Sequence, residues 1–209
     1  MTGKLLPTGN PTDVLNLPPS SPGGLSRTVR VSCVDAGNPV VFVQAEDLGF
    51  KGNESNKVLL AITPELLEIR ALASVKMGLW STVEEAVRSE GVPKVAIVGS
   101  PRSYVTPSGR VVRKEEIAIV IRAWSMGLPH PAFQMTGAVC LASACSIPGT
   151  LPYDIAHSSM GTHSTLKLGH ASGTMDVDSE LRMTDEGVEI ASASVYRTAR
   201  RLMEGTVFI

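Results

Sequence analysis

Hydrophobic and polar residues alternate along several short stretches of the chain, and this alternation predicts β-strands. Short turns rich in Gly and Pro join most of these stretches, so we expect mainly antiparallel pairing. The predicted strands cover residues 28–34, 39–44, 95–98, 110–112, 117–124, 164–168, 174–181, 188–195 and 206–209. A turn at Gly37-Asn38 separates the first two of them.

Apolar residues at helical spacing predict helices over residues 63–77 and 81–91. A third helix is predicted over residues 136–147, where Pro148-Gly149 ends it. Its many small residues allow other elements to approach closely, so we expect a buried central helix. Helices set among antiparallel strands indicate the α+β class.

Residues 1–27 are rich in Pro, Gly, Ser and Asn, which predicts an exposed loop or linker. The compact domain is expected to begin near Thr28. We find no internal repeat with a period of about 20–50 residues.

The 19 basic and 20 acidic residues leave a net charge of -1, which argues against binding to nucleic acid or to an anionic membrane. The longest apolar runs are far shorter than the roughly 20 residues that cross a bilayer, so we expect no membrane span. The three cysteines have no scaffold spacing, and no signal segment opens the chain. We therefore expect a cytoplasmic protein.

The segment Ser125-Met126-Gly127-Leu128-Pro129-His130 leads into the third helix and is the strongest candidate for chemistry. The first turn of a helix has backbone N–H groups without partners, and the helix dipole favours negative charge there. Thr136 and Gly137 lie at this position. The pattern predicts a small-anion site that suits a substrate carboxylate.

Each candidate residue also has a structural interpretation. His130 either faces a binding cleft or stabilises its own turn, and Ser125 and Met126 either contact a ligand or only shape the strand end. Asn38 either lines a cleft or serves as an ordinary turn residue. Cys140 is either a nucleophile paired with His130 or, as its apolar neighbours favour, a buried residue.

Other polar residues give weaker signals. The spacing of His157, His163 and His170 matches no metal-site pattern, so we expect no metal. Gly161, Gly169 and Gly173 lack the spacing of a phosphate-binding loop, so we expect no nucleotide. Arg197, Arg200 and Arg201 form either a solvated face or a packing surface.

Several blocks of the sequence, taken in order, resemble the 2-methylaconitate cis-trans isomerase (PrpF) family, which includes methylitaconate isomerases and oxalomesaconate tautomerases. The blocks are Leu6-Pro7-Thr8-Gly9-Asn10, Asp35-Ala36-Gly37-Asn38-Pro39, Pro93-Lys94-Val95-Ala96, the segment from Ser125 to Gly149, and Arg197-Thr198-Ala199-Arg200-Arg201 with the residues that follow to Gly205. They resemble the C-terminal half of the family, without its N-terminal half.

The resemblance implies a diaminopimelate-epimerase-like fold, in which each of two domains is a rolled antiparallel sheet around a central helix. Residues 28–202 would form the second domain, residues 1–27 a linker from the missing half, and residues 203–209 a strand that belongs to the first domain. Asn38, Ser125, Met126, His130, Thr136 and Gly137 would then line the cleft between the domains.

The family moves a proton in an unsaturated di- or tricarboxylate without a cofactor. As the resemblance implies, its catalytic cysteine and lysine lie in the N-terminal half, so no catalytic residue is assigned here and the chain is expected to be inactive alone. A non-catalytic module that pairs with another chain is the alternative, and a hydrolase using Cys140 and His130 is a weaker one. A homo-oligomer, or a partner that carries the N-terminal half, is also left open.

Overall fold

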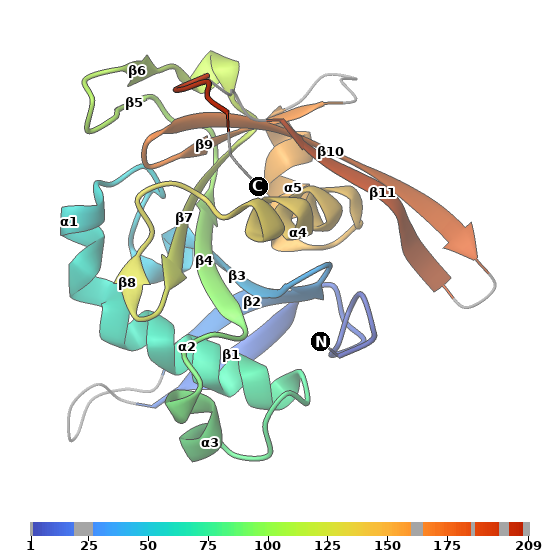
Figure 1. The fold of residues 1–209 in the computed structure, drawn as a ribbon. Helices are drawn as coiled ribbons and strands as arrows, with labels where there is room; N and C mark the ends of the chain where they lie inside the picture. The colour runs from blue at the N-terminus through green and yellow to red at the C-terminus, as the bar shows by residue number, and fades with distance from the viewer. Residues whose placement is uncertain (1, 19–26, 160–164, 185–186, 197–200, 207–209) are drawn as a thin grey trace.

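The computed structural model describes residues 2–18, 27–159, 165–184, 187–196 and 201–206 (Figure 1). A nine-stranded sheet forms the frame, with the order β1-β2-β3-β4-β7-β9-β10-β11 and β8 paired to β7. Its strands are β1 (Asp13–Leu17), β2 (Arg27–Asp35), β3 (Pro39–Gln44), β4 (Lys94–Gly99), β7 (Ile119–Ser125), β8 (Leu128–Pro129), β9 (Leu166–His170), β10 (Gly173–Thr184) and β11 (Gly187–Tyr196). Two further strands, β5 (Tyr104–Val105) and β6 (Val111–Val112), form a separate pair.

Five α-helices are described: α1 (Asn56–Leu59), α2 (Thr63–Lys76), α3 (Val83–Arg88), α4 (Met135–Ser146) and α5 (Leu151–Ser159). Short 3-10 helices occupy Ala45–Leu48, Leu60–Ile62 and Lys114–Glu116. Helix α4 contacts β2 and β3 as well as β10 and β11, which lie toward opposite ends of the strand order. The sheet therefore curls around α4, as expected of a central helix (Figure 1).

Alternating residues of the strands build a separate core on each face of the sheet. Ala96 and Ala123 pack with α4 and α5 on the inner face. Val95 and Trp124 pack with α2 on the outer face, where the indole nitrogen of Trp124 donates to Thr63 Oγ1 at 3.0 Å. Which face a strand residue occupies thus follows from its place in this alternation.

The expectation of an antiparallel sheet is wrong at two pairings. Strands β3 and β4 are parallel, and so are β7 and β9. The chain between β3 and β4 contains α1, α2 and α3, and the chain between β7 and β9 contains α4 and α5. Helical crossovers of this kind are the usual connection between parallel strands, so the sheet is mixed within the α+β class.

The prediction of a loop over residues 1–27 is wrong for Asp13–Leu17, which form β1 at the edge of the sheet. This strand was difficult to recognise because Asp13 is buried while Val14 is 57% exposed. The preceding residues also pack onto the sheet, since the amide of Asp35 donates to Leu5 O at 3.0 Å. The Pro- and Gly-rich stretch 19–26 lies outside the described residues.

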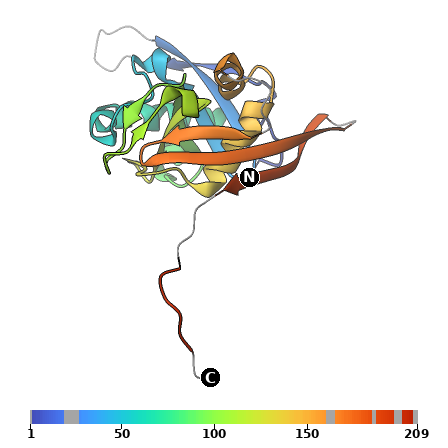
Figure 2. The ribbon, with the colours of Figure 1, turned by 90° about the horizontal axis from the view of Figure 1, so that it is seen from above.

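The end of the chain, where it is described, adds no strand to the sheet. The hairpin of β10 and β11 extends past the body of the protein, and the segment 201–206 that follows it in the chain contains no strand (Figure 2). Residues 207–209 of the predicted terminal strand lie outside the described part.

Within the described part, no single helix is long and apolar enough to cross a membrane, and α4 with α5 reaches that length only as a pair bent by 73°.

Candidate functional site

Three turns meet at one edge of the sheet, and the strand register brings them there. Val40 of β3 lies beside Lys94 of β4. Val95 of β4 lies beside Trp124 of β7, which places Lys94 opposite Ser125. The Gly37-Asn38 turn, the start of β4 and the turn after Ser125 therefore share an edge although they are far apart in sequence.

Lys94 and Ser125 point to the same side of the sheet as α4. Each lies two residues from an alanine of the inner core, Ala96 and Ala123, and alternate strand residues share a face. The ammonium of Lys94 donates to Ser125 Oγ at 3.1 Å. Partial burial lowers the pKa of Lys94, and nearby Arg70 lowers it further.

A strained two-residue turn follows Ser125. Ser125 and Leu128 are paired across it, and the residues between them have φ of 53° at Met126 and 74° at Gly127. Positive φ is easy for glycine but costly for methionine. The Met126 side chain is 62% exposed, so packing in the core does not hold it there.

The first turn of α4 has the donor groups that the sequence predicts. The amide of Ala138 is bonded to Gln134 O at 2.8 Å, so the amides of Thr136 and Gly137 precede the regular hydrogen-bond ladder of the helix. Thr136 is exposed, whereas Gly137 is buried. A Cβ at Gly137 would lie 3.0 Å from the ring of Phe133, which explains the glycine.

Gln134 is a site feature that the sequence analysis missed. It is the N-cap of α4, yet its side chain makes no capping hydrogen bond. Both polar atoms of its amide are buried without a hydrogen-bond partner in the described part of the chain. An unsatisfied buried amide is costly, and it marks a place where a ligand or another surface can supply partners.

The Asn38 turn lies against α4. A Cβ at Gly37 would be 3.9 Å from Val139 Cγ1, and Gly37 has a φ of 74° that suits glycine. Asn38 itself is half-buried. The structure thus places the Asn38 turn both beside α4 and on the sheet edge that carries Lys94 and Ser125.

His130 has contacts that stabilise its own segment. Its Nδ1 accepts from the amide of Ala132 at 3.1 Å, and its carbonyl accepts from Asn56 Nδ2 at 3.0 Å. No contact of its imidazole with Ser125 or Thr136 is present among the described residues. His130 is therefore not joined to the other candidates by a side-chain contact.

Cys140 lies in the core, as the buried-residue interpretation predicts. Its thiol is fully buried and donates to Val34 O at 3.4 Å. Burial raises the pKa of Cys140 to about 12. A thiol in this state has little thiolate character, so the geometry gives no support to a hydrolase that uses Cys140 with His130.

The remaining histidines and arginines are dispersed. His157 stacks on Tyr153 with 3.9 Å between ring centroids, and His170 is buried at the end of β9. His163, Arg197 and Arg200 lie outside the described residues, and Arg201 forms an ion pair with Glu204 at 2.8 Å. Among the residues described, no three His, Cys, Asp or Glu side chains are grouped so that they could hold a metal.

Two surface hollows lie near α4. One, of about 960 Å³, lies between residues 3–9, the segment Asp35–Gly37, Ile147 and the end of the β10–β11 hairpin. The other, of about 520 Å³, is lined by Arg110, Ala132 and the β9–β10 turn. In the described part of the chain, none of the six predicted site residues lines either of these two hollows.

The importance of Lys94 also escaped the sequence analysis. A lysine directly before the apolar run Val95–Val98 was a signal, but local sequence does not show which residue faces it across the sheet.

A profile described as PrpF protein matches residues 1–209. The chain belongs to the PrpF family.

The chain is similar to proteins that are named as isomerases. The chain is 36% identical over 208 residues to 2-methyl-aconitate isomerase of Shewanella oneidensis, covering 98% of this chain and 50% of that protein. It is 37% identical over 213 residues to 3-methylitaconate isomerase of Eubacterium barkeri, covering 100% of this chain and 53% of that one. The chain thus spans about half the length of these relatives.

A solved PrpF-family structure has the same fold. The crystal structure of methylitaconate-delta-isomerase superimposes with a TM-score of 0.81 at 37% identity. The match covers 98% of this chain and 51% of the other. The mixed sheet around α4 is therefore shared with an isomerase of this family.

Proposed function

We propose that this chain is the carboxylate-binding half of a PrpF-family isomerase that shifts a proton in an unsaturated di- or tricarboxylate. Relatives named 2-methyl-aconitate isomerase, 3-methylitaconate isomerase and (4E)-oxalomesaconate Delta-isomerase support this substrate class. The observation that carries the proposal is the first turn of α4 with its free amides, which directly precedes Val139, the α4 residue that faces Gly37 in the turn that carries Asn38.

In this proposal the amides of Thr136 and Gly137 bind one substrate carboxylate. Removing a proton next to a carboxylate places negative charge on the carboxylate oxygens, and hydrogen-bond donors already in place stabilise that charge. Asn38, Ser125 and Met126 form the rim of the same site, and His130 fixes the segment that leads to α4. The base and acid that move the proton are assigned to the other half, so the chain alone is inactive, and no cofactor is needed.

We assign the chain to the C-terminal half of the family, as the second domain of a diaminopimelate-epimerase-like fold. The substrate would then lie in a cleft between this domain and a first domain, supplied by another chain or another segment. The exposure of Thr136 and Met126 supports this assignment, because a first domain on the other side of the cleft would cover them.

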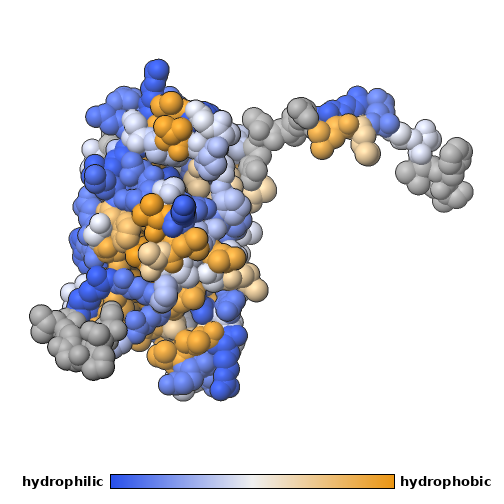
Figure 3. Space-filling view, turned by 90° about the vertical axis from the view of Figure 1, so that its left-hand side faces the viewer, coloured by the Kyte–Doolittle hydropathy of each residue, from blue (hydrophilic) through white to orange (hydrophobic). Residues whose placement is uncertain are grey.

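A non-catalytic binding or assembly module is the second candidate. Exposed apolar side chains near the site favour it: Met126 and Leu128 are each 62% exposed, and Met135 is 52% exposed. Figure 3 looks onto the side of the protein that carries α1 and β8, where hydrophobic side chains lie among polar ones. Such a surface suits contact with another protein.

The binding test uses the purified chain with trans-aconitate, followed by calorimetry and thermal shift. Thr136→Pro removes one donor from the first turn of α4, where proline is tolerated, and Thr136→Ala is the matched control that keeps the amide. We expect Thr136→Pro to weaken binding about tenfold, the effect of losing one charge-assisted hydrogen bond. Thr136→Ala should change it less than about threefold.

Circular dichroism of both variants tests whether α4 remains folded. Equal binding by Thr136→Pro and the unmodified chain would contradict the role of the helix start, and no binding by the unmodified chain would contradict the proposed function. Co-expression with the unmatched half of the Eubacterium barkeri relative separates the two candidates. Restored isomerase activity supports the enzyme, whereas co-purification without activity supports the assembly module.

A further inference from the structure

We propose that Lys94 and Ser125 form a second carboxylate subsite, which binds a different carboxylate of the substrate from the one bound at α4. This inference rests on the proposed function and adds a named pair of residues to it. The pair lies on the α4 side of the sheet, at the edge that carries the Asn38 turn.

The hydrogen bond between the two side chains leaves hydrogen-bond donors available on both. Lys94 is an ammonium with three donors and no acceptor, and it uses one donor on Ser125 Oγ at 3.1 Å. A serine hydroxyl that accepts from an ammonium directs its own hydrogen elsewhere. The pair therefore offers N–H and O–H donors to a common ligand, as a carboxylate requires.

The charge of Lys94 has no counter-ion in the described part of the chain. The ion pairs of other lysines, such as Lys76 with Asp13 at 3.4 Å and Lys167 with Asp176 at 3.6 Å, have no equivalent at Lys94. Partial burial disfavours an unpaired ammonium, and the nearby Arg70 adds repulsion. An incoming carboxylate would relieve both effects.

Arg70 does not compete with Lys94 for the carboxylate of the ligand. Arg70 is 3% exposed, and its guanidinium donates to Ser89 O and Ala86 O, which fixes it on the outer side between α2 and α3. It adds positive potential behind the pair without being accessible itself. Lys94, which is half-buried at the edge, is the accessible cation of the two.

Two carboxylate subsites at one edge explain how the site would select its substrate class. A monocarboxylate occupies the α4 subsite alone, whereas a di- or tricarboxylate also reaches Lys94 and Ser125. The second contact adds affinity and also fixes the orientation of the substrate, which is the requirement for proton removal at one particular carbon.

The test compares trans-aconitate with crotonate, an unsaturated acid with a single carboxylate. Calorimetry measures trans-aconitate, and saturation-transfer NMR measures the weaker crotonate. Lys94→Met removes the charge at similar length, Lys94→Arg keeps it, and Lys57→Met removes one exposed positive charge from α1 as the matched control. Ser125→Ala removes the hydroxyl.

We expect Lys94→Met to weaken trans-aconitate binding at least about tenfold while crotonate binding changes by less than about twofold. Lys94→Arg should retain most of the affinity, Ser125→Ala should show an intermediate loss, and Lys57→Met should behave as the unmodified chain. Equal effects of Lys94→Met on the two acids, or no effect on either, would overturn the subsite while leaving the α4 site in place. Failure of the unmodified chain to bind trans-aconitate would overturn both proposals.

Discussion

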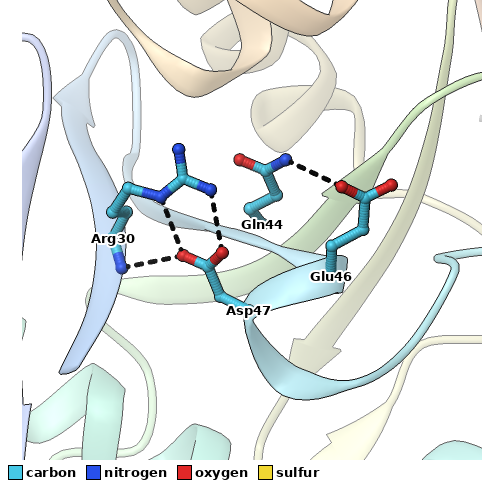
Figure 4. Close-up of polar contacts among 4 residues, drawn as sticks. All are labelled: Arg30, Gln44, Glu46 and Asp47. Carbon is cyan, nitrogen blue, oxygen red and sulfur yellow. Dashed lines mark hydrogen bonds and ion pairs between the residues drawn. The ribbon is translucent and has the colours of Figure 1, made fainter. Parts of the chain in front are cut away.

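Arg30 and Asp47 are joined by a two-point ion pair that fixes the 3-10 helix after β3 to β2. Nε and Nη2 of Arg30 donate to the two carboxylate oxygens of Asp47 at 3.0 and 2.8 Å, and the Arg30 amide adds a third bond at 3.1 Å (Figure 4). Next to it, Gln44 Nε2 donates to Glu46 at 3.4 Å. The side-chain bond from Arg30 is the main cause that lowers the pKa of Asp47.

Replacing Asp47 with Asn should therefore lower the free energy of unfolding by about 1 kcal/mol at neutral pH, because the Arg30 side chain is half exposed and solvent weakens the pair. The folded-state pKa lies below the unfolded value of about 3.9. The contribution is thus fully present above that value and is lost as pH falls through the folded pKa. Urea unfolding over a pH series measures it.

Asp178→Asn is the control, because the Asp178 carboxylate makes no ion pair with any residue that the structure describes. A difference between Asp47→Asn and the unmodified chain that persists unchanged at the lowest pH would show that the ion pair is not its source.

Met126→Asn should stabilise the protein. Asparagine tolerates positive φ better than methionine, and it is common in two-residue hairpin turns of this kind. We expect the free energy of unfolding to rise by about 0.5–1 kcal/mol. Leu128→Asn, outside the positive-φ positions, is the matched control and should give no gain. A loss of stability in Met126→Asn would mean that the Met126 side chain makes a contact that outweighs the strain.

Gln134→Met should separate stability from binding. The substitution replaces a buried amide without partners by an apolar side chain of similar length, so the free energy of unfolding should rise by about 1 kcal/mol. If the amide contacts the ligand, affinity for trans-aconitate should fall in the same variant. Chemical denaturation and calorimetry on one preparation measure both. Reduced stability would show that the Gln134 amide is satisfied in solution.

The thiols should resist modification in the folded protein. Cys33, Cys140 and Cys145 are all buried, and burial raises the pKa of Cys33 and Cys140 to about 12 each. A thiol reagent at neutral pH should label the native chain at least about a hundredfold more slowly than the unfolded chain. Mass spectrometry identifies the labelled residue, and fast labelling of Cys140 would revive the hydrolase hypothesis.

Local pattern was sufficient for elements that are apolar along nearly their whole length. Helix α4 was predicted within one residue at each end because small and apolar residues fill its length, and β4 and β7 were evident as apolar runs. Strand β1 was missed because its buried Asp13 and exposed Val14 reverse the expected pattern. Helix α5 was missed within the short segment that follows Pro148-Gly149.

The candidate site was only partly predictable for a different reason. The first turn of α4 and the Met126-Gly127 turn are local features, so sequence indicated them. The pairing of Lys94 with Ser125 depends on the register between β4 and β7, and the position of Asn38 beside α4 depends on the curl of the whole sheet. Interactions of that kind are set by tertiary structure and have no local signature.

The parallel pairing of β3 with β4 also decides when the site can exist during folding. The long chain between these strands must close before Val40 meets Lys94, and contacts between distant segments form slowly. We therefore expect Asn38, Lys94 and Ser125 to come together late in folding. Before these residues meet, the site does not exist and a ligand cannot bind. A ligand would therefore slow the unfolding of the native protein without speeding its folding.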